Sequence, residues 1–428
     1  MNIFTRRNLV IGWLFWLIAA IFYALDYFQH TAPSVLIKPI SLDMGVGVDQ
    51  IAYVMSIYFP IYAISQVPAG MLLDRFGARI MLSISCLVMS LGILLFVYEP
   101  NLNTMVFGRI LIAIGSAVAF IGCLKVAADV LPEKFFPIAV GLTNTLGVLG
   151  GIFGQLFLNY LVSLSGWKDA LAYIGYFGII WGVIIILLLT YKKESIDSSN
   201  LSESKTSKFF HSLILLKNKK LWLLAIYSGL MVGIVVNSFS ELYDVIFLEQ
   251  AYHVTESVAA KISVMMFVGI AFGGPSHGII ASLFGEKRIW MFICNIFTIT
   301  IFSSIVLFAS IINPNLLFVL FFLLGFFVSS MLLAFSVVEE IFPKEIKGTA
   351  LAIVNMIIGL CGALFQFLIS YISVLLNGGP IHININNNVF NRAFVFLLVP
   401  LLISTVIISH MALLKYRENR RKSRLLQL

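Results

Sequence analysis

The sequence predicts an all-α membrane protein in which twelve transmembrane helices form two six-helix repeats. Composition is the first reason: of the 428 residues, 60% are hydrophobic and only 11% are charged, and the mean hydropathy is +1.00. Soluble domains rarely reach such values, because their surfaces need charged side chains. A soluble enzyme is therefore not expected, and a nucleic-acid partner is not needed to explain the net charge of +8.

The second reason is the number of apolar segments. A helix needs about 20 mostly apolar residues to cross the hydrocarbon core of a bilayer. The first segment is too long for the core of a signal peptide, so we expect it to remain as a helix. The twelve expected helices cover residues 9–36, 51–73, 78–98, 105–129, 138–162, 170–191, 221–247, 259–283, 289–311, 316–340, 348–376 and 390–414.

The third reason is an internal repeat with a constant offset of 211 residues. Six matches in one register predict a duplicated six-helix unit. At an offset of 208, the segment from Gly278 to Gly285 also repeats the spacing from Gly70 to Gly77, but it lacks the acid. The six matched pairs are Asp129 and Glu340, Pro132 and Pro343, Ala139 and Ala350, Asn144 and Asn355, Gly151 and Gly362, and Gln155 and Gln366.

The basic residues predict how the chain is oriented. With the N-terminus in the cytoplasm, 22 of the 28 Lys and Arg residues fall in internal loops and tails, four fall outside and two lie within helix 4. Because basic residues favour the cytoplasmic side, we expect a monomeric, multi-pass protein of the inner (cytoplasmic) membrane with both termini inside. The expected domains are an N-terminal bundle at 1–191, a cytoplasmic linker at 192–220 and a C-terminal bundle at 221–428 with a basic tail.

Helix 1 carries polar and aromatic residues on one stripe. Tyr23, Asp26, Tyr27 and His30 follow i, i+3, i+4, i+7 spacing, and Arg109 lies at a similar depth in helix 4. Ionisable side chains cost about 2.5 to 3.5 kcal/mol at the centre of a membrane helix, so those that persist usually face a cavity or a partner. We predict that Asp26 exchanges a coupling proton or binds a solute amine, and that Arg109 either holds a solute carboxylate or lowers the pKa of Asp26. A structural ion pair between the two is the alternative.

Helix 7 is the repeat partner of helix 1 and carries a second polar stripe. Asn237, Glu241 and Asp244 follow i, i+4, i+7 spacing. Glu241 is the second candidate for a protonatable group, whereas Asp244 is expected near the lipid headgroups. Asn144 and Asn355, which the repeat relates, are candidate solute contacts, and the glycines near them are expected to serve helix packing.

Lys125 lies near the cytoplasmic end of helix 4, with Asp129 four residues later. The preferred interpretation is a snorkelling lysine that pairs with this acid. The alternative is a solute ligand in an inward-facing state.

Motifs for nucleotide binding, paired metal ligands and an activated nucleophile do not occur in the sequence. We therefore expect no cofactor, no metal and no enzymatic activity. If the protein moves a solute, the energy must come from an ion gradient or from the gradient of the solute itself. Carboxylates in the apolar core favour protons as the ion, and sodium stays open. The expected partners are a small-molecule solute, protons or sodium, and the lipid bilayer.

A polar turn separates expected helices 2 and 3. Its pattern, Gly70-x-x-x-Asp74-Arg75-x-Gly77-x-Arg79, resembles the signature loop of the major facilitator superfamily. The resemblance extends over nearly the whole chain. It implies the major facilitator fold, rocker-switch alternating access, and a solute cavity lined by helices 1, 4, 7 and 10.

The same resemblance implies that this turn is a conformational switch. Its acid, Asp74, is expected to meet the start of helix 11 near Gly348, where the positive end of the helix dipole favours an anion. Arg79 is expected to meet an acid that closes helix 4, for which Asp129 is the candidate. In this interpretation the turn is a cytoplasmic latch that does not touch the solute.

Several segments resemble the phagosomal transporter type permeases of intracellular bacteria more closely. Characterised members of that group import amino acids or nucleosides. His30 stands where the group tends to have Arg, and the proline-containing helix 5 signature of drug antiporters is absent. The matching segments are Asp26-Tyr27, Ala32 to Val35, Gln66 to Gly70, Gly141 to Gly147, Gly154-Gln155, Gly166 to Lys168, and Gly348 to Asn355.

The predicted function is proton-coupled uptake of a small polar nutrient such as an amino acid. One alternative is an exporter of a metabolite, siderophore or drug. An alternative of a different class is a sensor that binds a solute without moving it. The short linker and tails argue against a sensor, because they are too small to fold into an output domain.

Overall fold

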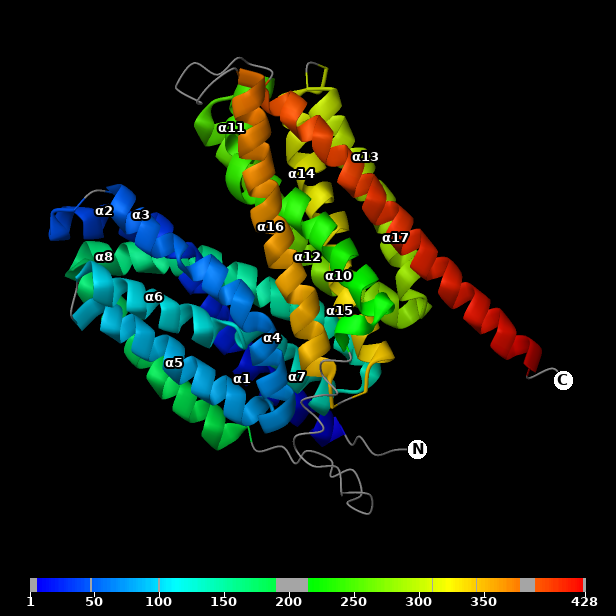
Figure 1. The fold of residues 1–428 in the computed structure, drawn as a ribbon, viewed down its shortest axis with the longest axis horizontal. Coiled ribbons are helices and arrows are strands. Elements are labelled where there is room, and N and C mark those ends of the chain that lie inside the picture. The colour runs from blue at the N-terminus through cyan, green and yellow to red at the C-terminus, as the bar shows by residue number, and fades with distance from the viewer. Residues whose placement is uncertain are drawn as a thin grey trace. The chain divides into compact units, whose positions relative to one another are not determined.

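The computed structural model describes residues 6–46, 48–98, 101–189, 215–309, 311–343, 345–377 and 389–425, and the regular structure within them is helical (Figure 1). Most of the linker expected at 192–220 lies outside these residues. Contacts divide the chain into two compact units. Unit 1 comprises Met1–Lys217 and Ile341–Met356, and unit 2 comprises Asn218–Glu340 and Ile357–Leu428.

Unit 1 contains the N-terminal helices together with the start of one late helix. Within it, α5 packs against both α6 and α8, and α1 packs against α7 and α8 (Figure 1). Its elements are α1 (Arg6–Thr31), α2 (Pro33–Met44), α3 (Val48–Ser56), α4 (Tyr58–Phe76), α5 (Ala78–Tyr98), α6 (Leu102–Ser116), α7 (Ala119–Val130), the 3-10 turn η1 (Glu133–Phe135), α8 (Phe136–Leu188), the 3-10 turn η3 (Leu215–Lys217) and the first part of α16 (Lys347–Asn377).

Unit 2 contains the remaining helices, one of which includes a π-helical stretch. Here α12 packs against α14, and α17 packs against α13 and α10. Its elements are α10 (Lys219–Val232), the π-helix η4 (Gly233–Tyr243), α11 (Asp244–Tyr252), α12 (Glu256–Phe284), α13 (Lys287–Leu307), α14 (Pro314–Val328), the 3-10 turn η5 (Ser329–Leu332), α15 (Leu333–Ile341), the rest of α16, and α17 (Val389–Leu425).

Within the described ranges, eleven helices are long and apolar enough to cross a membrane. One of these spans, Glu133–Leu188, has 56 residues, which is more than twice the length that a bilayer needs. Gly166 breaks it with φ 81° and ψ 169°, a backbone conformation that glycine adopts without steric cost. The long helix is therefore two spans, and the predicted all-helical fold of twelve spans is confirmed.

Prolines divide the first two expected helices. The helix expected at 9–36 is two helices, because α1 ends at Thr31 and α2 begins at Pro33, and proline is favoured in the first turn of a helix. The next is interrupted at Ile57, between α3 and α4. Pro60 explains this break, because it has no N–H to donate to the carbonyl of Ser56.

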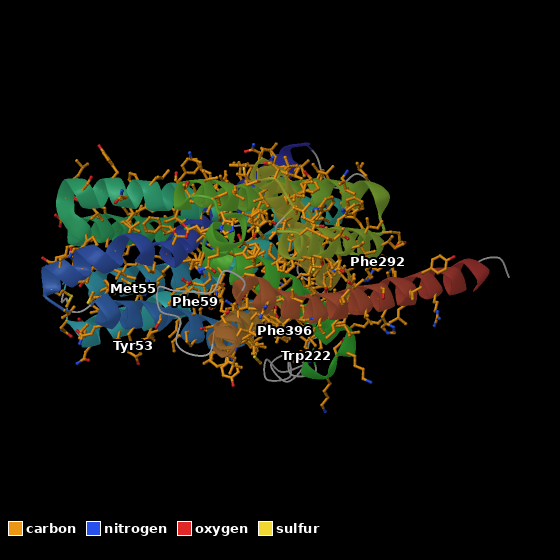
Figure 2. The ribbon with its side chains drawn as sticks, turned by 90° about the horizontal axis from the view of Figure 1, so that it is seen from above. Tyr53, Met55, Phe59, Trp222, Phe292 and Phe396 are labelled. Atoms are coloured by element: carbon orange, nitrogen blue, oxygen red, sulfur yellow. The ribbon has the colours of Figure 1, made fainter. Side chains whose placement is uncertain are left out.

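Large apolar side chains cover much of the outer surface of each unit. Tyr53 is 69% exposed, Phe59 57% and Phe396 56%, and their side chains project from α3, α4 and α17 (Figure 2). Extensive apolar exposure is rare on soluble monomers. It is expected where the surrounding solvent is lipid, which also requires the backbone hydrogen bonds to close within helices.

Glycines on α8 make room for aromatic rings of α1. A Cβ atom added to Gly147 would lie 2.5 Å from Cε1 of Tyr23, and one added to Gly151 would lie 2.8 Å from Cδ1 of Tyr27. No side chain fits at such distances without displacing a ring. The packing role expected for these glycines is confirmed, and it fixes the orientation of the aromatic stripe on α1.

A second close approach occurs between α4 and the start of α16. A Cβ atom added to Gly70 would lie 2.5 Å from Cβ of Ala352, 2.8 Å from the carbonyl oxygen of Gly348 and 2.9 Å from Cα of Thr349. Two of these three atoms belong to the backbone and cannot move aside alone. Gly70 therefore allows the two helices to touch, as small residues do at membrane helix interfaces.

One polar clamp ties α2 to the kink in α8. Nζ of Lys168 lies 2.8 Å from Oδ2 of Asp43, and Nε1 of Trp167 donates a hydrogen bond to the same oxygen at 3.2 Å. The hydrogen bond from Lys168 holds the pKa of Asp43 below its ordinary value. Both charged side chains are 45% exposed, so water screens the pair and limits its contribution to stability.

The clamp predicts a small, acid-sensitive stabilisation. Because folding lowers the pKa of Asp43, the stabilisation is fully present above the unfolded value of about 3.9 and is lost as the pH falls through the lower folded value. Asp43→Asn should lower the Tm of the purified protein by about 2 °C or less at pH 7, with the difference from wild type shrinking below about pH 4. Asp169→Asn, at an exposed neighbouring carboxylate, is the control. A difference that persists unchanged in acid would contradict this account.

Gly70→Ala should destabilise the protein because it inserts a methyl group into the contact between α4 and α16. Overpacking of this kind typically costs about 1 to 3 kcal/mol. Gly359→Ala on α16 is the matched control, since a Cβ added there meets nothing within 4 Å. Thermal unfolding in detergent would measure both variants, and equal Tm values would show that α4 and α16 do not need this close approach.

Candidate functional site

A buried carboxyl group lies on α1 within reach of α4. Asp26 is 0% exposed, and the hydroxyl of Tyr58 donates a hydrogen bond to its Oδ1 at 3.3 Å. The same hydroxyl lies 2.8 Å from Nε2 of His30, which is 3.8 Å from Oδ2 of Asp26. The side chain of His30 is 22% exposed. These three residues form a continuous polar chain from a fully buried carboxyl to a partly exposed imidazole.

Aromatic rings surround the imidazole of His30. The ring of Tyr27 stacks on it at 5.6 Å, and the rings of Tyr58 and Tyr62 present their edges at 4.8 Å and 5.4 Å. Tyr23 lies 6.0 Å from Tyr27 in an edge contact. The stripe predicted on helix 1 is thus brought together with tyrosines of α4, and the faces of such rings attract cations.

Arg109 enters this site from α6 and is 4% exposed. Its Nη2 donates a hydrogen bond to the carbonyl of Met55 at 3.2 Å, and its guanidinium lies 5.2 Å above the ring of Tyr58. The alternative of an Asp26 to Arg109 ion pair is not realised, since no acid pairs with Arg109 among the described residues. The Met55 carbonyl, next to the break between α3 and α4, supplies an acceptor in its place.

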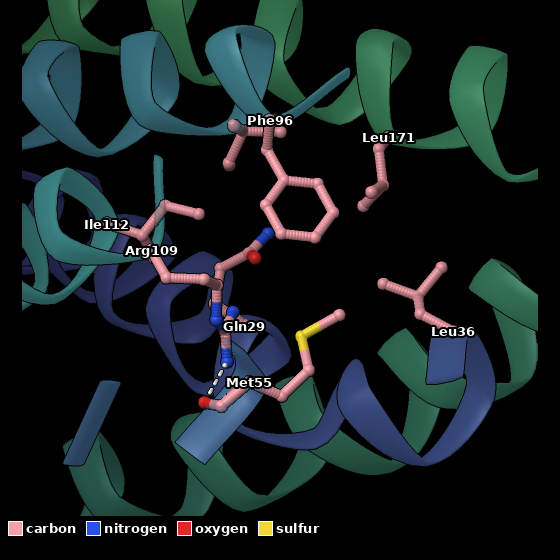
Figure 3. A pocket seen from close by; sticks show the side chains of 8 residues that line it. Gln29, Leu36, Met55, Phe96, Arg109, Ile112 and Leu171 are labelled. Carbon is pink, nitrogen blue, oxygen red and sulfur yellow. Dashed lines mark hydrogen bonds between the residues drawn. The ribbon is translucent and has the colours of Figure 1, made fainter. Parts of the chain in front are cut away.

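Arg109 also lines a small cavity with Gln29, Met55, Phe96 and Leu171 (Figure 3). Its volume is about 10 Å³, which is room for about one water molecule. Nε2 of Gln29 and Nε of Arg109 have no hydrogen-bond partner within the described part of the chain. The cavity is too small for a nutrient, so it is not the solute site itself. It places the polar groups of Gln29 and Arg109 next to that site.

A polar ladder runs along α4 below the aromatic rings. Tyr62, Gln66, Gly70 and Asp74 recur at every fourth residue, so they form one continuous row that turns slowly around the helix. Asn355 of α16 donates hydrogen bonds from Nδ2 to Oε1 of Gln66 at 3.1 Å and to the hydroxyl of Tyr62 at 3.3 Å. This candidate solute contact is thus bonded to α4, whereas Asn144, the residue that the repeat relates to it, is half-buried on α8.

Asp74 is the last residue of this ladder on α4, and its carboxylate binds the first turn of α16. Its Oδ1 accepts the N–H of Gly348 at 2.8 Å, and its Oδ2 accepts the N–H and the hydroxyl of Thr349 at 2.7 Å and 2.8 Å. A helix N-terminus leaves such N–H groups unpaired and carries positive partial charge. The carboxylate therefore lies at the helix start that the resemblance to the superfamily implied. We refer to Asp74, Gly348 and Thr349 as the latch.

Lys125 lies in a different environment from the one expected for a snorkelling lysine. It does not snorkel to water, because its side chain is 2% exposed. Its Nζ lies 3.6 Å from Oδ1 of Asp74, whose side chain is 4% exposed, so this buried lysine compensates the latch carboxylate. Asp129 is half-buried on α7, one residue before the helix ends.

The other residues of the polar turn have separate roles. Gly77 ends α4 with φ 82°, in the region that favours glycine. Arg79 was expected to meet Asp129, but its Nε and Nη2 donate hydrogen bonds to the carbonyl of Ile186 at 2.8 Å and 2.6 Å, near the negative end of α8. The guanidinium of Arg75 lies 5.1 Å from the ring of Phe76.

In unit 2, the polar stripe of helix 7 lies on or beside the π-helix η4. The backbone carbonyl of Asn237 accepts a hydrogen bond from Nε2 of Gln366 at 2.7 Å. Glu241 is exposed on the surface of this unit. Asp244 is 2% exposed and its Oδ2 accepts a hydrogen bond from Ser240 at 3.4 Å, so its carboxyl is buried within the unit.

In unit 2, the repeated turn from Gly278 to Gly285 lacks the acid of the first turn, and ion pairs lie beside it. Nζ of Lys287 lies 2.8 Å from Oε1 of Glu340, and Nη2 of Arg288 lies 3.5 Å from Oε2 of the same residue. The segment from Gly278 to Gly285 therefore keeps its glycines, while the charges lie just after it and at the end of α15. The two repeats fix corresponding turns with different chemistry.

Sequence reasoning gave Tyr58 and Gln66 too little weight. Tyr58 is one of 15 tyrosines, and tyrosine abundance alone does not single it out. The signal that identifies both is their spacing, because 58, 62, 66, 70 and 74 form one four-residue series that ends in the polar turn. The break before α4, which exposes the carbonyl of Met55 to Arg109, has a signal in Pro60.

Comparison with known proteins gives the same fold from independent information. The family description that matches this chain is the Major Facilitator Superfamily, over residues 15–247 and 242–427. Among the solved structures that it resembles is the bound form of the proton:xylose symporter XylE, with a TM-score of 0.65, 16% identity, and coverage of 95% of this chain and 96% of that chain. At this identity the likeness concerns the fold alone.

Two curated relatives illustrate the range of sequence similarity. The probable galactarate/D-glucarate transporter GudP of Escherichia coli is 21% identical over 408 residues, which is 87% of this chain and 90% of that protein. The probable anion transporter 6 of Arabidopsis thaliana is 30% identical over 183 residues, or 41% of this chain and 35% of that protein. For several such relatives the chain spans less than half of their length. The twelve spans and the match of the family over most of the sequence establish that this chain belongs to the Major Facilitator Superfamily, a superfamily of membrane transporters.

Proposed function

We propose that the protein takes up a small polar solute bearing a carboxylate, together with protons, by rocker-switch alternating access. An amino acid is the narrower form of this proposal that the resemblance to phagosomal transporter type permeases favours. An organic acid is the form that the names of the relatives favour, since these include an anion transporter and a galactarate/D-glucarate transporter. A carboxylate is common to both classes of solute.

The observation that carries the proposal is the burial of two ionisable groups, Arg109 and Asp26, beside Tyr58. Arg109 has no acidic partner among the described residues, although it is 4% exposed. A buried cation without a counter-ion is costly, and its field attracts an anion. A solute carboxylate would supply the missing charge. Asp26, also buried but joined to the partly exposed His30, is the group that would carry the proton.

Glu241 and Asn237 remain the proposed contributions of unit 2. Glu241 is an exposed carboxylate on a π-helix, and short π-helical stretches occur often at functional sites because they widen the turn and free backbone groups. In this proposal Glu241 binds a solute amine or a second proton. Tyr23, Tyr27, Asn144 and Asn355 would provide neutral contacts.

The latch is the proposed switch of the transport cycle. Asp74 binds two N–H groups and one hydroxyl of the first turn of α16, and Lys125 neutralises it. Gly70 lets the helices approach, while Gly77, Arg75 and Arg79 shape and anchor the turn. Breaking these bonds would release the start of α16 from Asp74.

The remaining features of the proposal concern the setting of the protein. It would lie in the inner (cytoplasmic) membrane as a monomer, with both termini in the cytoplasm, as the distribution of basic residues favours. Protons are the proposed coupling ion, with sodium as the alternative. Export of a metabolite, siderophore or drug, and solute sensing without transport, are the competing functions that the first experiment below separates.

Purified protein in proteoliposomes should accumulate a carboxylate solute when the lumen is more alkaline than the medium. The panel is radiolabelled D-glucarate and the common amino acids, with inorganic phosphate as an anion that has no carboxylate. Asp26→Asn should reduce accumulation by about tenfold or more, because proton transfer by a positioned group contributes on the order of 10² to 10⁴ in rate. Exchange of internal for external solute, which needs no net proton movement, should continue.

Asp169→Asn, at an exposed carboxylate, is the control for this substitution. Accumulation by Asp26→Asn at the wild-type level would remove Asp26 from the coupling role. Accumulation driven by a sodium gradient alone would replace the ion. Solute binding without flux would favour a sensor, and flux only out of the vesicles would favour an exporter.

Asp74→Asn should reduce transport about tenfold while leaving solute affinity within about twofold of wild type. The amide still accepts one N–H, but it loses the charge that attracts Lys125 and the helix dipole. Uptake in proteoliposomes and equilibrium binding in detergent measure the two quantities. Glu133→Gln, at an exposed acid of η1, controls for loss of a nearby negative charge. Parallel losses of binding and transport would argue against a switch.

A further inference from the structure

We propose that Tyr58 relays protons between the buried carboxyl of Asp26 and the partly exposed imidazole of His30. The inference rests on the proposed proton coupling and deepens it by giving the proton a path. Tyr58 takes part directly in this scheme: its hydroxyl accepts one proton and releases another, and it keeps no net charge.

A path is needed because Asp26 has no direct access to water. Its exposed fraction is 0%, whereas the side chain of His30 is 22% exposed. The direct separation of Nε2 of His30 from Oδ2 of Asp26 is 3.8 Å, which is too long for a hydrogen bond. The hydroxyl of Tyr58 lies 3.3 Å from Asp26 and 2.8 Å from His30, and it is the group that joins them.

The hydroxyl can form this chain of hydrogen bonds in two directions. It has one proton to donate and lone pairs that accept. When Asp26 is ionised, Nε2–H of His30 donates to the hydroxyl oxygen and the hydroxyl donates to Asp26. When Asp26 is protonated, its O–H donates to the hydroxyl oxygen and the hydroxyl donates to a bare Nε2 of His30. Both arrangements keep the Tyr58 hydroxyl hydrogen-bonded to Asp26 and to His30.

Transfer from Asp26 converts one arrangement into the other. The Asp26 O–H bond breaks as its proton bonds to the oxygen of Tyr58, while the Tyr58 O–H bond breaks as that proton bonds to Nε2 of His30. Asp26 loses one proton, His30 gains one, and Tyr58 ends unchanged. The reverse sequence loads Asp26 from His30. No oxidant or co-reactant takes part.

The neighbouring helices hold Tyr58 in the required place. Tyr58 is 0% exposed, the guanidinium of Arg109 from α6 lies 5.2 Å above its ring, and Tyr62 stacks on it at 5.6 Å. Arg109 is the charged group that faces the relay from α6, and Tyr27 and Tyr62 are the titratable groups that face His30 from α1 and α4. A clamped ring keeps the hydroxyl between Asp26 and His30.

The test is to separate proton flux from solute exchange in Tyr58→Phe. This variant keeps the ring and its contacts and removes only the hydroxyl. Proteoliposomes would carry a pH-sensitive dye, with D-glucarate as the organic-acid probe and L-alanine as the amino-acid probe. Solute-dependent proton entry should fall about tenfold or more, while exchange of internal for external probe stays within about twofold. Tyr53→Phe, at a tyrosine that is 69% exposed on α3, is the matched control and should behave like wild type.

His30→Gln provides a second measurement, because glutamine can hydrogen-bond to Tyr58 but cannot take up a proton. It should show the same split between proton entry and exchange. Proton entry at the wild-type rate in either variant would overturn the relay alone. Equal losses of entry and exchange in Tyr58→Phe would also overturn it, since they would indicate a structural role. Exchange by wild-type protein without solute-dependent proton entry would overturn the proposed coupling and the relay with it.

Discussion

The cost of an ionisable group in a medium without water is the constraint on which the polar structure of unit 1 depends. Asp26 and Arg109 are 0% and 4% exposed, and the side chain of Asp74 is 4% exposed. Each takes its partners from another helix: the hydroxyl of Tyr58 for Asp26, the carbonyl of Met55 for Arg109, and the first turn of α16 for Asp74. The same bonds that make burial tolerable therefore connect helices that transport would have to move.

Irregular backbone makes these partners available. A regular helix uses its own N–H and C=O groups, so a buried side chain finds backbone partners where a helix starts, breaks or widens. Pro60 accounts for the break beside Met55, and the first turn of α16 offers the N–H groups of Gly348 and Thr349. In unit 2, the carbonyl of Asn237 within the π-helix η4 accepts a hydrogen bond from Gln366. The polar groups proposed to act in transport thus lie where the helices depart from regular geometry.

The fold could be predicted from the sequence. The length of each apolar segment indicates a membrane helix by itself, and the internal repeat follows directly from residue spacing. The placement of Asp74 followed from the resemblance to the superfamily, and its partners are backbone N–H groups that the first turn of a helix leaves unpaired. The sequence was insufficient for side-chain partners, which depend on the packing of distant segments. Periodicity put Lys125 near Asp129 on one helix, but packing buries it against Asp74 on another. Arg79 likewise binds the carbonyl of Ile186, 107 residues away, and no local pattern encodes that contact.

One helix links the proton site to the switch. Tyr58 and Asp74 lie 16 positions apart on α4, or about 24 Å at 1.5 Å per residue, and Pro68 between them is where the helix bends most easily. The first part of α16 contacts α4 on both sides of that proline, through Asn355 at Tyr62 and Gln66 and through the latch at Asp74. Because α16 holds both segments, it opposes bending at Pro68, and a displacement at Tyr58 reaches Asp74 as a shift of the whole helix. Under the proposed function, a movement of Tyr58 that accompanies proton transfer at Asp26 would be transmitted through α4 to the latch.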